Sequence, residues 1–215
     1  SIMSMFIKKI ARQIASNVLF WRIRHIFQPS WILSYEKKDS SYILDLAKSY
    51  KCKTVLDYGC ASGKTLEDIK DLSPEDTYVY GIDINISAVN FCKNKFHKKY
   101  ASGFTFKKSF NIESLNKFLL LYKKKEFDLI IFDRVLYCID DKTLSSFLAD
   151  ACNITNMIFI DDFDSQDNTS EEEYLHRDWA EILSKFNFRL ISKDDTCYQR
   201  VERASAKSMV FKMSQ

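Results

Sequence analysis

The 215-residue sequence contains only four glycines and two prolines. A chain with so few glycines is expected to keep them where the backbone needs conformational freedom or where another group must approach closely. Two of the four, Gly59 and Gly63, stand only four positions apart. This pair therefore indicates a turn with a demanding backbone, and it is the first candidate for a ligand-binding loop.

Other absences bound the class of protein. The six cysteines form no C-x-x-C pair and show no metal-ligand spacing, which argues against a disulfide framework or a zinc site and predicts reduced thiols in a cytoplasmic protein. No run of 18 apolar residues occurs, so a membrane-spanning helix is not expected. With 46% hydrophobic residues, the chain can bury the core of one domain.

The basic charge is concentrated near the start of the chain. Residues 1–35 carry five basic side chains and no acidic one, whereas the remainder has a slight acidic excess. Apolar residues recur at helical spacing from Ile7 to Trp21, which predicts an amphipathic helix. We expect a segment at 1–40 that caps the domain at 41–215, docks peripherally on a membrane surface or contacts a partner. Because the basic footprint is local, a general nucleic-acid binder is not expected, and the oligomeric state stays open.

The glycine pair lies between two regular elements. Val55 and Leu56 end an apolar strand, and a helical stretch follows the second glycine. A turn between a buried strand and a helix is where a nucleotide-like ligand meets backbone N–H groups. Twenty residues after Gly63, Asp83 stands near the end of a second apolar strand. The pattern predicts a βαβ unit with an acidic residue at the end of its second strand.

Two common nucleotide-binding loops do not fit this spacing. Dinucleotide dehydrogenases carry G-x-G-x-x-G, and its third glycine is absent here. A phosphate-binding P-loop has four residues between its glycines, whereas Gly59 and Gly63 enclose three. The sequence Gly63-Lys64-Thr65 therefore does not indicate a P-loop.

The segment Thr54–Lys64, TVLDYGCASGK, resembles motif I of the class I S-adenosylmethionine-dependent methyltransferases. The usual form of this motif is two hydrophobic residues followed by Asp/Glu-x-Gly-x-Gly-x-Gly. Asp57, Gly59 and Gly63 match it, and Ala61 replaces the middle glycine. The resemblance covers residues 41–213. It implies an α/β fold with a Rossmann-like sheet of seven mostly parallel strands, the last strand antiparallel, and helices on both faces.

The resemblance also implies S-adenosylmethionine as the cofactor. Asp83 would accept both ribose hydroxyls, because a carboxylate offers two oxygens to two neighbouring donors. Ile84 and Asn111 would lie near the adenine, and Cys60 would fill space within the loop. The full set of expected cofactor-binding residues is Asp57, Gly59, Cys60, Ala61, Gly63, Asp83, Ile84, Asn111 and Asp133.

Candidate catalytic residues follow the fourth and fifth expected strands. Asp133 follows the apolar run 127–132, at the strand end where open α/β sheets place their chemistry. The two prolines that base-methylating enzymes of this fold carry at this place are absent. His176 is expected on a helix at 171–186, and its imidazole titrates in the range that a general base needs. Asp133 and His176 are therefore the candidate catalytic residues.

Asp161 and Asp162 directly follow the expected strand 157–160, and two interpretations stay open. Together with Asp133, they would form a divalent-metal site like that of metal-dependent O-methyltransferases. Seven acidic residues within 161–173 instead favour a water-facing loop, so no metal ligand is assigned.

The sequence thus favours an S-adenosylmethionine-dependent methyltransferase that modifies an oxygen of a small-molecule, lipid-linked or sugar-type acceptor. Three alternatives remain: the metal-dependent O-methyltransferase just described, a non-catalytic binding subunit that keeps the cofactor fold, and an RNA methyltransferase that uses the basic N-terminal segment.

Overall fold

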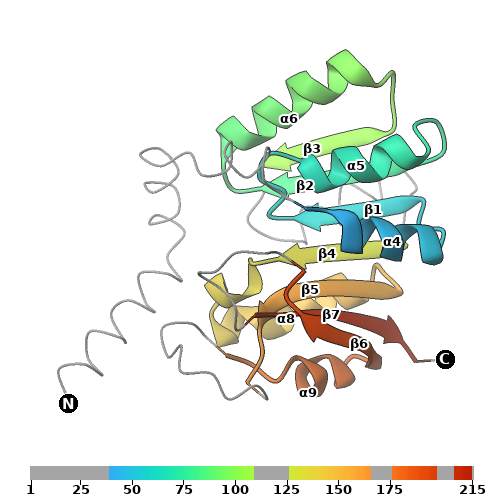
Figure 1. Cartoon of the computed structure of the whole chain (residues 1–215). Helices are drawn as coiled ribbons and strands as arrows, with labels where there is room; N and C mark the ends of the chain where they lie inside the picture. Colours follow the sequence, from blue (N-terminus) through green and yellow to red (C-terminus); the bar gives the residue numbers. More distant parts are fainter. Residues whose placement is uncertain (1–38, 109–125, 166–175, 198–205, 215) are drawn as a thin grey trace.

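The computed structural model describes residues 39–108, 126–165, 176–197 and 206–214 (Figure 1). The expected N-terminal helix and Asn111 lie outside these residues. Within them, no helix is long and apolar enough to cross a membrane.

A single seven-stranded sheet forms the centre of the molecule, in the order β3-β2-β1-β4-β5-β7-β6 (Figure 1). Strand β7 pairs antiparallel with both β5 and β6, and all the other pairs are parallel. The expected fold is therefore confirmed, including the antiparallel last strand. The strands are β1 (Thr54–Tyr58), β2 (Tyr78–Asp83), β3 (Phe104–Lys108), β4 (Leu129–Asp133), β5 (Met157–Phe163), β6 (Phe188–Asp195) and β7 (Ala206–Met213).

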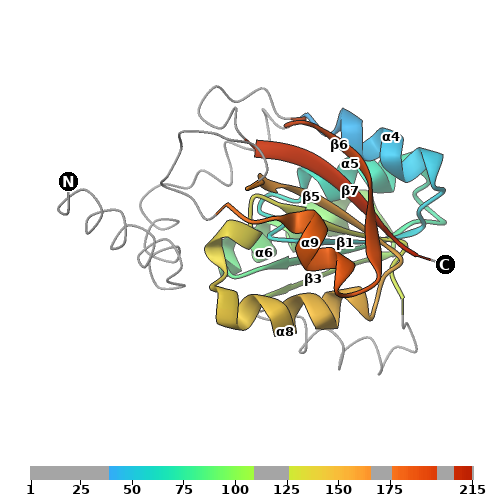
Figure 2. The same ribbon diagram turned by 90° about the horizontal axis from the view of Figure 1, so that it is seen from below.

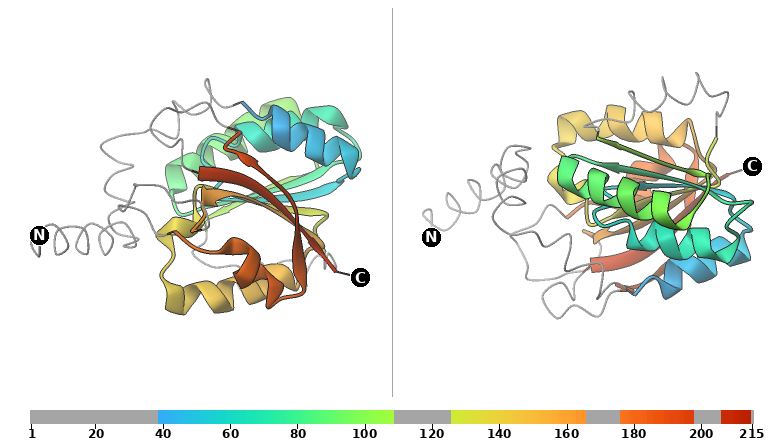
Figure 3. Two further views of the ribbon diagram at one scale, coloured as in Figure 1. Left: turned by 60° about the horizontal axis from the view of Figure 1, so that its bottom comes forward. Right: turned by 90° about the horizontal axis from the view of Figure 1, so that it is seen from above.

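Helices cover both faces of this sheet (Figures 2 and 3). One face packs against α4 (Ser41–Ser49), α5 (Lys64–Leu72) and α6 (Ile86–Lys99). The opposite face packs against α8 (Asp141–Cys152) and α9 (Trp179–Ser184). A short 3-10 turn, η1 (Leu136–Cys138), follows β4.

The central strands are apolar on both sides because both sides are buried. In β4, Ile130 and Phe132 join the core beneath α8 and α9, whereas Leu129 and Ile131 join the core beneath the other three helices. All four side chains are completely buried. Alternate residues of a strand point to opposite faces, so a strand covered on both faces reads as a continuous apolar run.

Buried charges fix α5, the helix that begins directly after the glycine pair. Lys70, which is completely buried, donates hydrogen bonds to the carbonyl oxygens of Pro74 and Thr77 beyond the helix end. Glu67 accepts from Lys95 at 2.6 Å and from Lys99 at 3.0 Å, both on α6. These bonds hold α5 against its neighbours and so fix the position of the loop that precedes it.

Candidate functional site

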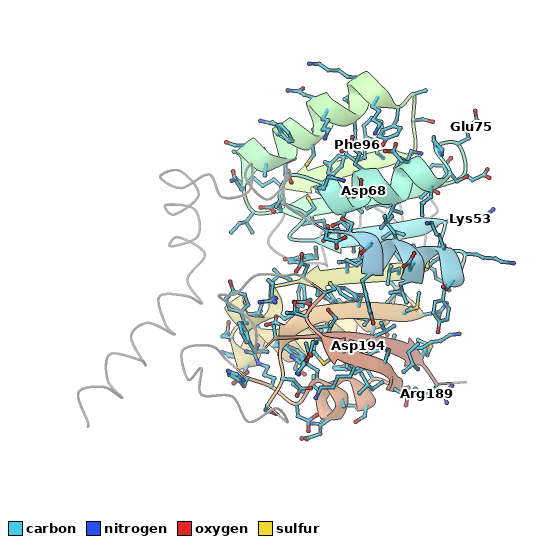
Figure 4. The ribbon with its side chains drawn as sticks, in the orientation of Figure 1. Lys53, Asp68, Glu75, Phe96, Arg189 and Asp194 are labelled. Atoms are coloured by element: carbon cyan, nitrogen blue, oxygen red, sulfur yellow. The ribbon has the colours of Figure 1, made fainter. Side chains whose placement is uncertain are left out.

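The candidate site lies at the carboxyl-terminal ends of the parallel strands, here called the carboxyl edge of the sheet. β1 ends at Tyr58, β2 at Asp83, β4 at Asp133 and β5 at Phe163. Lys53, just before β1, lies at the opposite edge (Figure 4). Since ligands of open α/β sheets bind outside the carboxyl ends of the strands, the site is expected at the carboxyl edge.

The loop after β1 is tied to the end of β2 by backbone hydrogen bonds. The N–H groups of Gly59 and Cys60 both donate to the carbonyl oxygen of Ile82, at 2.8 and 3.0 Å. The N–H of Ala61 donates to Asp83 Oδ2 at 2.9 Å. Three consecutive residues of the loop are thus held by two consecutive residues of β2.

This loop needs the left-handed backbone region. Gly59, Ala61 and Gly63 have φ values of 86°, 47° and 70°. The conformation is free for glycine but costs an alanine roughly 1–2 kcal/mol. Ala61 therefore adopts a left-handed conformation at a cost in free energy, whereas the glycine usually found at this place of the motif adopts it freely. A Cβ atom added to Gly63 would lie only 2.9 Å from Cys92 Sγ, so this position also lacks room for a side chain.

Asp83 presents a hydrogen-bond-accepting carboxylate at the end of β2. Its Oδ2 accepts from Ala61 and its Oδ1 accepts from the N–H of Asn85 at 2.8 Å. A carboxylate accepts hydrogen bonds on both of its oxygens, with about four lone-pair sites in all. Asp83 keeps 9% of its surface exposed. A pair of vicinal hydroxyls therefore fits the acceptor chemistry of this side chain.

The other residues expected in the cofactor site lie nearby but differ in exposure. Asp57 lies within β1 and is 1% exposed, and Ile84 directly follows β2 and is half-buried. Cys60 is buried, and a hydrogen bond with Cys92, followed by burial, raises the pKa of its thiol well above the ordinary value. Cys92 Sγ in turn donates to the carbonyl oxygen of Ala61 at 3.3 Å. Cys60 is thus an uncharged packing residue beneath the loop.

A second strained loop begins directly after Asp133. Arg134 has a φ of 54°, and its N–H donates to the carbonyl oxygen of Asp161 at 2.9 Å. Its Nε donates to Asp161 Oδ1, and its Nη2 donates to Thr196 Oγ1 at 2.9 Å. Side chain and backbone of this arginine are therefore both held by the end of β5.

Asp161 is the centre of this buried polar network. Its Oδ2 accepts from Thr196 Oγ1 at 2.9 Å and from Ser208 Oγ at 2.6 Å. Burial raises the pKa of Asp161, the Arg134 guanidinium opposes that rise, and the neighbouring Asp133 adds to it. The carboxylate is completely buried but well supplied with donors, which is how a folded protein keeps such a charge.

The three-carboxylate metal site expected from Asp133, Asp161 and Asp162 is not assembled. β5 continues to Phe163, so Asp161 and Asp162 are consecutive strand residues that point to opposite faces. Asp162 accepts from the N–H groups of Tyr137 at 3.1 Å and Phe163 at 2.8 Å. Among the described residues, no three His, Cys, Asp or Glu side chains are grouped to hold a metal ion.

The alternative expectation, a water-facing acidic loop, is also wrong for the beginning of this segment. Asp161 and Asp162 are completely buried and Asp164 is 2% exposed. Asp164 forms an ion pair with Lys193 at 3.0 Å. The later acidic residues, from 167 to 173, lie outside the described part of the chain.

His176 lies at the end of β5 rather than on a helix. The helix α9 begins at Trp179, and Asp178 caps it by accepting from the N–H of Glu181. The centre of the His176 ring lies 5.5 Å from that of Phe163, and the Tyr137 ring contacts Phe163 from 5.8 Å.

Arg177, the next residue, fixes this arrangement. It donates to the carbonyl oxygens of Leu136 at 2.9 Å and Ile139 at 2.5 Å, and so ties the segment to the turn η1. The structure thereby brings the histidine to the same sheet edge as Asp133.

Arg134, Thr196 and Ser208 are site residues that the sequence did not reveal. Thr196 and Ser208 lie 35 and 47 positions from Asp161, and no local pattern connects them. The only local signal is a basic residue that directly follows Asp133 at the end of an apolar strand. A basic side chain at such a place either extends into solvent or forms hydrogen bonds with groups at the carboxyl ends of the neighbouring strands, and the sequence does not show which.

Comparison with known proteins defines the class of this fold and site. A family model described as a methyltransferase domain matches residues 50–215, more than half of the chain. The chain therefore belongs to this methyltransferase domain family. Its fold is that of the class I enzymes, whose cofactor is S-adenosylmethionine. No curated protein matches the sequence.

Solved structures of low sequence identity share the fold. Magnesium protoporphyrin IX methyltransferase from Synechocystis PCC 6803, with bound S-adenosylhomocysteine, is 15% identical, with a TM-score of 0.62 over 96% of this chain and 100% of the other. The mitomycin 7-O-methyltransferase MmcR is 10% identical, with a TM-score of 0.63 over 85% of this chain and 54% of the other. The methyltransferase domain of bacterial CtHen1-C is 16% identical, with a TM-score of 0.59 over 82% and 97%.

The buried Asp162 predicts a pH dependence of stability. Burial raises the pKa of Asp162 to about 7, although the two backbone N–H groups oppose the rise. An aspartate in the unfolded chain titrates near pH 3.9, so between about pH 4 and 7 the folded protein binds a proton that the unfolded chain has released. The free energy of unfolding should therefore fall as pH rises through this window, by up to about 4 kcal/mol.

Chemical denaturation at pH 5 and pH 8 measures this effect. Asp162→Asn cannot ionise, so the stability difference between wild type and variant should shift in favour of the variant at the higher pH. Asp76→Asn, at an exposed position, should leave the pH profile of the wild type unchanged. A difference between Asp162→Asn and wild type that is equal at both pH values would contradict the prediction.

Proposed function

We propose that the chain transfers the methyl group of S-adenosylmethionine to a hydroxyl oxygen of a small-molecule, lipid-linked or sugar-type acceptor. The observation that carries this proposal is the place of Asp83, a carboxylate at the end of β2 that also holds the glycine loop. Membership of the methyltransferase domain family supports a methyl group as the group that is transferred.

Different described residues would bind different parts of the cofactor. The loop from Gly59 to Gly63 would hold the methionine part and Asp83 the ribose hydroxyls, while Ile84 would lie against the adenine. Bound S-adenosylmethionine supplies a methyl group already activated on a sulfonium, so the chain mainly needs to orient the acceptor and exclude water. The role of Asn111 near the adenine stays a prediction from the sequence.

A hydroxyl acceptor must lose its proton, and two side chains at this edge are candidates for the base. Asp133 ends β4, and His176 lies against Phe163 at the end of β5. An imidazole is the more suitable base near neutral pH because its ordinary pKa lies closest to that range. The mitomycin 7-O-methyltransferase, whose name indicates oxygen as its acceptor atom, shares the fold and supports this choice of chemistry.

Cofactor binding tests the role of Asp83. Asp83→Ala removes the acceptor for the ribose hydroxyls and also the tether of Ala61, and hydrogen bonds to a charged group are worth about 1.5–3 kcal/mol. Isothermal titration with S-adenosylhomocysteine should therefore show affinity at least about tenfold weaker. Asp76→Ala, an exposed change, should bind like the wild type. Equal affinity in Asp83→Ala and wild type would remove Asp83 from the site.

Turnover tests the proposed reaction. A methyl-transfer screen across hydroxyl-bearing compounds, run with and without EDTA, should find an acceptor whose methylation does not depend on a divalent cation. His176→Gln should lower kcat by about a hundredfold or more, as expected for loss of a general base. His97→Gln, on the exposed face of α6, serves as the matched control. Cofactor binding without transfer to any compound would instead favour a non-catalytic binding subunit.

A further inference from the structure

Arg134 contains a buried hydrogen-bond donor that no other described residue accepts. Its side chain is 10% exposed, its Nε faces Asp161 and its Nη2 faces Thr196. Nη1 is buried and has no hydrogen-bond partner among the described residues. A guanidinium carries five N–H donors, two of them on Nη1, and buried donors in folded proteins are nearly always paired. The unused donor therefore calls for a partner other than the described residues, and a bound ligand is one such partner.

The backbone of Arg134 gives independent evidence that this position is functional. Four non-glycine residues of the described chain have a positive φ. Lys51 and Asn187 follow the ends of α4 and α9, where a left-handed residue is ordinary. Ala61 and Arg134 are instead in the loops after β1 and β4, at the carboxyl edge of the sheet. Backbone strain of this kind gathers at binding and catalytic sites.

The surroundings of Arg134 place it in the half of the site where the acceptor would bind. It directly follows Asp133, and its guanidinium carbon lies 5.5 Å from the centre of the Phe163 ring. The candidate base His176 contacts that same ring. The partners of its other nitrogens come from β5 and from the end of β6, on the side of β4 away from the cofactor loop and Asp83.

We propose that Arg134 Nη1 donates a hydrogen bond to an oxygen atom of the methyl acceptor, which makes Arg134 a specificity-determining residue. The inference rests on the proposed function, because it assigns an acceptor-binding group to the same site. The bonds to Asp161 and Thr196 hold the guanidinium in one orientation, so its remaining donor is presented at a fixed place.

The charges around Arg134 indicate the chemical class of the acceptor. Asp161 balances the guanidinium, and Asp133 adds a negative charge beside the pair. The nearby lysines are also paired, Lys193 with Asp164 and Lys207 with Asp195. Since the described residues in this part of the edge carry no excess positive charge, it suits an uncharged hydroxyl or carbonyl oxygen better than a phosphate or a carboxylate. The acceptor is therefore an uncharged, oxygen-bearing compound such as a sugar or a phenol.

Three variants separate this role from a structural one. Arg134→Lys keeps a positive charge for Asp161 but lacks Nη1, and Arg134→Met removes both. Arg189→Met is the matched control, because Arg189 is exposed near the start of β6, at the other edge of the sheet (Figure 4). Titration with S-adenosylhomocysteine reports whether each variant is folded and keeps its cofactor site.

Methyl transfer is measured on pairs of compounds, each hydroxyl compound beside its phosphorylated or carboxylated derivative. Wild type should prefer the uncharged member of each pair. Both Arg134 variants should bind S-adenosylhomocysteine within about threefold of wild type but raise the KM for the acceptor about tenfold to a hundredfold, with a smaller effect on kcat. Arg189→Met should change neither quantity.

The outcomes distinguish the two proposals. A wild type that does not bind S-adenosylhomocysteine overturns the proposed function and, with it, this role of Arg134. A wild type that binds and turns over overturns the role of Arg134 alone if it prefers the charged compounds or if Arg134→Lys leaves the KM unchanged. Cofactor binding without transfer to any compound overturns both proposals, because both require methyl transfer to an uncharged oxygen acceptor.

Discussion

The hydrogen bond from the N–H of Ala61 to Asp83 Oδ2 is the constraint on which the candidate site depends. It joins the loop after β1 to the end of β2, and it compensates for the left-handed backbone of Ala61. The carbonyl of Ile82 holds the two preceding residues of the loop in the same way. Asp83 thus shapes the loop and, in the proposed function, also binds the cofactor that the loop surrounds.

The same device occurs a second time at this edge of the sheet. Asp161 on β5 holds Arg134, the left-handed residue that follows β4, as Asp83 on β2 holds Ala61 after β1. In both cases a carboxylate on one strand fixes the exit loop of the neighbouring parallel strand. The first pair organises the side of the site proposed for the cofactor, and the second organises the side proposed for the acceptor.

The resemblance to the class I methyltransferases predicted the fold, and local patterns predicted the loop and the acid of the first of these pairs, although not the hydrogen bond that joins them. Gly59, Gly63 and Asp83 lie within one βαβ unit, so their spacing alone predicted the loop and the acid at the strand end. The second pair, Asp161 with Arg134, was not predicted, because Asp161 interrupts an apolar run and its position looks like the end of a strand. Its partners Thr196 and Ser208 come from distant segments of the chain, and only the folded sheet shows that they satisfy a buried carboxylate.

A crystal structure of the chain with S-adenosylhomocysteine tests the central claim most directly. The account predicts both ribose hydroxyls within hydrogen-bonding distance of the Asp83 carboxylate, with the bond to the N–H of Ala61 still in place. It also predicts that the methionine part lies against residues 59–63. A nucleoside bound elsewhere, or bound with Asp83 turned away from the ribose, would contradict it.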